Sequence, residues 1–128
     1  MSLLDALRAF LIAQGFENVF KLQYPHESDE MISLHERENP MGFGARGINY
    51  GIRAAKVQIR VRRKTPEAAE ADARRIFHSL DSGTDEASIP LAPGRSVTSR
   101  PAPPFFLESD EKGRWVWVLK ATILTNGL

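Results

Sequence analysis

The segment from Val57 to Arg62 alternates strictly between apolar and polar side chains, and it constrains the fold more than any other part of the chain. One face carries Val57, Ile59 and Val61, and the other carries Gln58, Arg60 and Arg62. A period of two is the spacing of a β-strand, and a single apolar face is typical of a sheet with one side buried and one side in water. The segment therefore predicts a half-buried strand, whose start lies between Ile48 and Val57.

Helical patterns precede and follow this strand. Apolar residues recur at helical spacing from Leu3 to Leu11, and Gly15 can supply a left-handed cap, so a helix is predicted over residues 3–14. Thr65 and Pro66 form a typical helix start, an N-cap hydroxyl followed by a proline that already has helical φ. The apolar spacing that follows predicts a second helix, ending near Leu80.

Further strands are predicted at residues 19–22, 31–36, 105–108 and 114–125, with one short strand near 95–99 and a hairpin turn at 110–113. Strands that are grouped, and do not alternate with helices, indicate the α+β class. We therefore expect one domain spanning residues 1–128, with a mostly antiparallel single sheet and two helices packed on one face. The expected order is α-β-β-β-α-β-β with one extra short strand.

Composition excludes several classes of protein. The chain has no cysteine, which excludes disulfide scaffolds, cysteine zinc sites and cysteine nucleophiles. The 17 basic and 16 acidic residues nearly cancel, which argues against a binder that relies on a large basic excess. The longest apolar runs are much shorter than the ~20 residues that span a bilayer, so no membrane segment is expected. No basic region precedes the apolar residues near the N-terminus, so no signal peptide is expected.

No pattern of side chains points to catalysis, a cofactor or a metal. Residues 42–47 match the G-x-G-x-x-G spacing of dinucleotide sites, but the required strand before it and helix after it are absent from the pattern. His26, His35 and His78 lack the spacing of a helical zinc site. We expect no enzyme and no cofactor, and interpret the glycine-rich segment as a binding loop in which Phe43 and Arg46 contact another subunit.

Two charged runs have opposite signs. Residues 53–64 contain six basic side chains and no acid, and residues 27–38 contain five acids. The basic run is either the exposed face of a strand or a patch for an acidic partner or DNA phosphates. Complementary patches on one chain permit head-to-tail contacts, which close into rings.

Two tryptophans, Trp115 and Trp117, share a face of the last predicted strand. Core packing is the ordinary role for such residues, and an interface anchor is the alternative, because tryptophan is enriched where binding energy concentrates. Base stacking is the least favoured role, since the chain lacks a large positive excess.

The whole pattern resembles a known family. The resemblance is carried by the strand at residues 57–62, by Pro66–Ala68 and Ala73–Ile76 in the second helix, and by residues 105–110 and 113–117. The chain resembles, from about Leu3 to Ile123, the small minor capsid or tail terminator proteins of tailed bacteriophages and prophages. The resemblance implies an α+β fold and a ring, typically a hexamer, on the last ring of the tail tube. Such a ring stops tube growth and presents the surface that joins the head.

The resemblance therefore implies a structural virion protein of the tail or neck, assembled in the bacterial cytoplasm. Its expected partners are further copies of itself, the tail tube protein and a head-completion or connector protein; double-stranded DNA would pass through without sequence-specific binding, and no membrane is involved. The residues expected at the subunit or tube interface are Phe43, Arg46, Arg60, Arg62, Trp115 and Trp117. Two alternatives remain open: a head-completion or connector protein on the capsid side, and a small nucleic-acid-binding module using residues 53–64 and the tryptophans.

Overall fold

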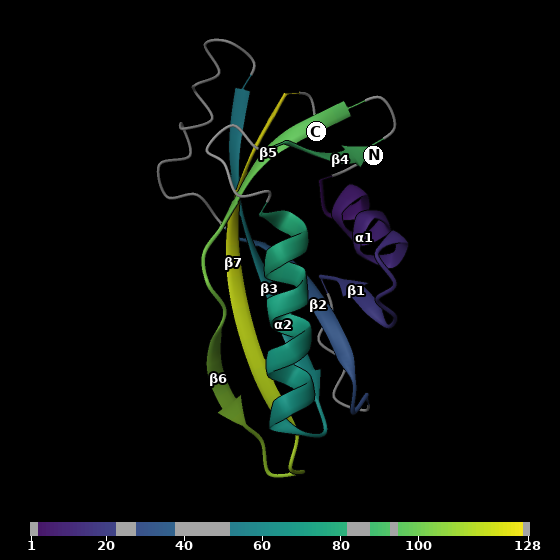
Figure 1. The fold of residues 1–128 in the computed structure, drawn as a ribbon, viewed down its shortest axis with the longest axis vertical. Coiled ribbons are helices and arrows are strands. Elements are labelled where there is room, and N and C mark those ends of the chain that lie inside the picture. The colour runs from purple at the N-terminus through teal and green to yellow at the C-terminus, as the bar shows by residue number, and fades with distance from the viewer. Residues whose placement is uncertain (1–2, 23–27, 38–51, 82–87, 93–94, 127–128) are drawn as a thin grey trace.

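The computed structural model describes residues 3–22, 28–37, 52–81, 88–92 and 95–126. The N-terminal elements are α1 (Leu3–Ala13), β1 (Val19–Lys21), β2 (Met31–Arg37) and β3 (Ile52–Arg63). After α2 (Pro66–Leu80) come β4 (Ser88–Ala92), β5 (Arg95–Pro101), β6 (Phe105–Ser109) and β7 (Trp115–Asn126). These elements confirm the predicted α+β class (Figure 1).

Local sequence signals determine where α1 ends and where α2 begins, as expected. Gly15 has φ +99°, and the N–H groups of Gly15 and Phe16 donate to the carbonyls of Ile12 and Leu11, which closes α1 with a Schellman motif. The hydroxyl of Thr65 accepts the N–H of Ala68 at 3.2 Å and caps the start of α2.

The strands form one mostly antiparallel sheet. Its order is β1-β2-β3-β7-β5-β4, and only the pairing of β1 with β2 is parallel among the described strands. The two longest strands, β3 and β7, pair along their whole length at the centre. β5 and β6 follow one another along the same edge of β7, and Pro103 and Pro104 separate them because proline cannot donate to a ladder.

One strand was not expected from the sequence. β4 contains Pro90 and has a register shift between Ile89 and Ala92, both of which weaken a strand signal. Proline is tolerated at the edge of a sheet, where its missing N–H faces no partner strand, and β4 lies at that position.

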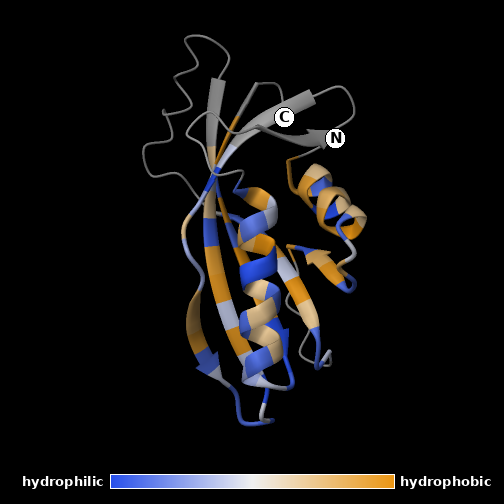
Figure 2. Cartoon of the chain, viewed as in Figure 1, coloured by the Kyte–Doolittle hydropathy of each residue, from blue (hydrophilic) through white to orange (hydrophobic). Residues whose placement is uncertain are grey.

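Both helices pack on the same face of the sheet. Buried residues of α1 and α2 join the alternate residues of the central strands in one continuous cluster, which includes Leu7, Ile76, Ile59 and Leu119. Figure 2 shows hydrophobic stretches on α1, β1 and β7, interrupted by hydrophilic residues. The sheet also curls, since β1 and β4 lie at opposite ends of the strand order and both contact α1.

Neither helix is long and apolar enough to cross a membrane, as judged for the residues that the structure describes.

Candidate interaction surfaces

The structure places four of the six predicted interface residues. Phe43 and Arg46, with the glycine-rich segment around them, lie outside the described residues. Arg60 and Arg62 lie on β3, and Trp115 and Trp117 lie on β7.

The four placed residues divide between the two faces of the sheet. Trp117 is opposite Val61 in the pairing of β7 with β3, and Arg60 is opposite Val118. Paired residues share a face and neighbours along a strand alternate, so Trp117 faces the helices whereas Arg60 faces away from them. The tryptophans and the exposed basic side chains of β3 therefore cannot form one continuous surface.

Arg62 is not exposed, which corrects the expectation that Gln58, Arg60 and Arg62 form a fully solvated face. Arg62 is 1% exposed, and its guanidinium donates to the carbonyl of Ser28 at 2.5 Å. The physical reason is the parallel pairing of β1 with β2, which requires a crossover connection. Ser28 belongs to that connection and contacts Arg62, so this residue lies against the outer face where β3 ends.

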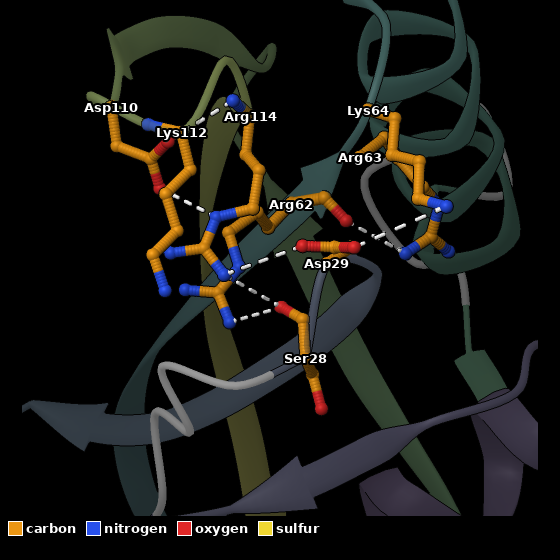
Figure 3. Close-up of polar contacts among 8 residues, drawn as sticks. All are labelled: Ser28, Asp29, Arg62, Arg63, Lys64, Asp110, Lys112 and Arg114. Carbon is orange, nitrogen blue, oxygen red and sulfur yellow. Dashed lines mark hydrogen bonds and ion pairs between the residues drawn. The ribbon is translucent and has the colours of Figure 1, made fainter.

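A network of arginines and aspartates surrounds this contact (Figure 3). Arg114, only 5% exposed, donates to the same Ser28 carbonyl at 3.2 Å and to the carboxylate of Asp110 at 2.7 Å. Asp29 lies 3.8 Å from Arg114 and 4.0 Å from Lys64. The network joins the crossover, the end of β3 and the hairpin before β7, and gives these basic residues a structural role.

The carboxylate of Asp110 also forms the hairpin turn. It accepts the backbone N–H groups of Lys112 at 2.9 Å and Arg114 at 3.0 Å, and Gly113 has φ +75°. Desolvation opposes ionisation, but the hydrogen bonds from Arg114 and Lys112 and the charge of Arg114 outweigh it, so the pKa of Asp110 is lowered from its ordinary value of 3.8.

This lowered pKa predicts an acid-dependent stability. The ionised Asp110 stabilises the fold fully above pH 3.8, its ordinary pKa, and that contribution disappears as the pH falls towards the lower pKa of the folded state. We expect Asp110→Asn to melt at a lower temperature than the wild type at about pH 6, and the gap to narrow by about pH 2.5. Circular dichroism melts measure this, with Glu111→Gln in the same hairpin as control; a gap independent of pH would contradict the prediction.

Arg63, next to Arg62, faces the helices. Its guanidinium donates to Asp72 of α2 at 2.7 Å and to the carbonyls of Met31 and Arg62 at 3.3 and 3.0 Å. Asp72 also pairs with Arg75 at 3.3 Å. Acids from other elements therefore accompany the basic run of β3, although the run itself contains none.

The strand β6 presents the most concentrated apolar surface of the described residues. Phe105, Phe106 and Leu107 are 43%, 46% and 40% exposed and follow one another along the strand. Within the part of the chain that the structure describes, β6 pairs only with β7, so its other edge is open. The sequence predicted the strand but not this surface, although three consecutive large apolar residues between Pro104 and Asp110 were an available signal.

The tryptophans extend this surface towards α2. The ring of Phe106 lies 5.7 Å from that of Trp115 and 6.3 Å from that of Trp117, measured between centroids. The guanidinium of Arg74 on α2 lies 5.9 Å from the Trp117 ring. Trp117 packs against the core and both tryptophans are half-buried, so they support Phe106, whereas Phe105 is paired with Val118 and lies on the face of the sheet away from the helices.

A basic surface lies on the face of the sheet away from the tryptophans, the face that Phe105 shares. Its side chains, all on the face away from the helices, are Lys56 and Arg60 of β3, Arg100 of β5 and Lys120 of β7. We call these four residues the basic face. Desolvation and the positive charge of Arg60 lower the pKa of His35, whose imidazole nitrogen lies 2.6 Å from the hydroxyl of Ser33.

No group of three metal-ligating side chains lies close enough to hold an ion among the described residues.

Comparison with known proteins gives one family. A family model described as "Bacteriophage tail terminator protein" matches residues 14–126. The match extends from the end of α1 through β7. The matched family is the one that the sequence resembles. A search of curated proteins found no match.

Proposed function

We propose, from the premise that this chain belongs to the bacteriophage tail terminator family, that it forms a ring of identical subunits on the end of the tail tube. Family membership makes the chain a structural protein of the phage tail and thus a component of the virion. The ring stops the tube from growing and provides the surface to which the head is joined. Assembly takes place in the host cytoplasm.

The observation that carries the ring proposal is the apolar open edge of β6. An exposed edge strand with large apolar side chains invites pairing with another chain, and proteins that stay monomeric usually protect such edges. Here β6 is short and bulged, which limits uncontrolled pairing, yet it exposes Phe105, Phe106 and Leu107. A neighbouring subunit would bury these side chains.

The predicted interface residues take different parts in this proposal. Trp115 and Trp117 support Phe106 of β6, and Arg60 lies on the other face of the sheet from the tryptophans. Arg62 acts indirectly, by holding the crossover in place. Contact of Phe43 and Arg46 with a neighbour or the tube stays a prediction for the segment outside the described residues.

Tail length tests the proposal directly. We expect tails assembled without this protein to vary in length and to exceed the normal length, because tube growth has no stop. Adding the purified protein during assembly should restore a uniform length, measured by electron microscopy. Normal tails and unjoined heads in its absence would contradict capping and favour a head-completion or connector protein.

A further inference from the structure

A cyclic ring of three or more identical subunits joins two different surfaces of the same chain, because a surface that pairs with its own copy forms a two-fold dimer. The exposed side chains of β6 therefore need a different surface on the neighbouring subunit. A specific interface also buries ~800 Å² on each partner, which is more than three side chains can supply when each is about two-fifths exposed. Side chains outside β6 must therefore take part.

Leu22 is the most exposed large apolar residue in the part of the chain that the structure describes. It is 66% exposed and directly follows β1. β1 lies at one end of the strand order, whereas β6 pairs with the far edge of β7, and Figure 1 shows these two strands on opposite sides of the central pair. The exposed apolar side chains of Leu22 and β6 thus lie on opposite sides of one subunit, as a head-to-tail contact requires.

The backbone of Leu22 is strained. Its φ of +60° lies in the left-handed region, which a bulky side chain rarely adopts. Its N–H donates to the carbonyl of Leu34 at 2.9 Å and so continues the ladder between β1 and β2. The side chain buries little within the subunit, so packing there does not offset the strain. Burial against another molecule would give a leucine at this position a function.

The outer edge of β1 is covered by α1. The N–H of Leu22 bonds to β2, so the backbone groups of Lys21 and Val19 alternate with it and point away from β2. The guanidinium of Arg8 donates to the carbonyl of Val19 at 2.8 Å, and Lys21 forms an ion pair with Asp5. α1 therefore runs antiparallel to β1. A neighbour's strand would have to displace these contacts to pair with β1, which leaves the side chain beyond its end for the contact.

We infer, on the basis of the proposed ring, that Leu22 of one subunit packs on the exposed apolar side chains of β6 of the next subunit. The partner is a second copy of this chain, and the contact is head-to-tail. Each subunit thus contributes β6 to one neighbour and the end of β1 to the other.

Cysteine crosslinking tests the contact, because the chain has no cysteine of its own. Tails assembled with the double variant Leu22→Cys with Leu107→Cys are treated with a short bismaleimide and separated on a denaturing gel. We expect a ladder of covalent oligomers, because each subunit can be linked to both neighbours. Each single variant should give only monomers.

The matched control is Ile12→Cys with Leu107→Cys. Ile12 is an exposed apolar residue of α1, and because α1 runs antiparallel to β1, it lies towards the start of β1 whereas Leu22 lies at its end. This pair should give no ladder.

Leu22→Asn separates assembly from folding. Asparagine tolerates the left-handed region better than leucine does, so the melting temperature of the dilute subunit should stay the same or rise. The protein concentration that restores a uniform tail length should rise about tenfold to a hundredfold, which corresponds to the loss of one buried leucine per contact.

The outcomes distinguish this contact from the ring itself. Uniform tails without a ladder would overturn the inference and leave the ring proposal intact, and so would Leu22→Asn acting at the wild-type concentration. An effect of Leu22→Asn without a ladder would place Leu22 on the tube. Covalent dimers of the Leu107→Cys single variant would show a two-fold contact through β6. Wild-type protein that stays monomeric on tails would refute the ring, and this contact with it.

Discussion

Replacing Arg62 with alanine is expected to lower the free energy of unfolding by about 2–4 kcal/mol. The side chain is 1% exposed and donates to the Ser28 carbonyl at 2.5 Å. Truncation would leave a cavity between the sheet and Ser28 and would remove one of the two arginines that bind this carbonyl. Chemical denaturation of wild type and variant measures the difference.

The matched control is Arg60→Ala, two residues away on the same face of the same strand. Arg60 is partly exposed, so its truncation should cost less than about 1 kcal/mol. Arg62→Met keeps most of the side-chain volume without the charge. Its loss in free energy of unfolding should lie between those of the two alanine variants, because apolar groups of similar size can replace buried ionic ones. Equal stability of the alanine variants would show that Arg62 is not part of the folded framework.

The contrast between Arg60 and Arg62 shows how far the sequence predicts this fold. The alternation of β3, the capped start of α2 and the hairpin turn depend on neighbouring residues, and the structure confirms each of them. The burial of Arg62 depends on Ser28, which precedes β2 in another part of the chain and accepts a hydrogen bond from its guanidinium. No local pattern around β3 contains that information.

The candidate surfaces depend on sheet register even more strongly. Lys56, Arg100 and Lys120 are far apart in the sequence, and only the pairing of β3 and β5 with β7 brings them together. The same register separates Arg60 from Trp117. It therefore weakens the alternative in which the basic strand and the tryptophans jointly bind nucleic acid, although the sequence pattern alone permitted it.

Introducing two charges on β6 is expected to abolish assembly while the subunit stays folded. Phe105→Glu with Leu107→Glu would place carboxylates on the apolar strand; Lys120 lies near the first position, but a neighbouring subunit would have to bury the second without a partner. Both side chains are about two-fifths exposed, so folding loses little packing and the melting temperature should fall by only a few degrees. Light scattering after size exclusion measures the mass, and electron microscopy measures tail length.

The control for this variant is Ile12→Glu on α1, whose side chain is 44% exposed and lies away from β6. It introduces the same kind of charge at a similarly exposed apolar site, so its assembly should match the wild type. Phe106 is left unchanged because it packs on Trp115 and Trp117. Should the double variant unfold, Leu107→Lys alone tests the same surface. A folded β6 variant that still forms rings would show that subunits meet elsewhere, since a buried interface cannot accept unpaired charges without a large loss of affinity.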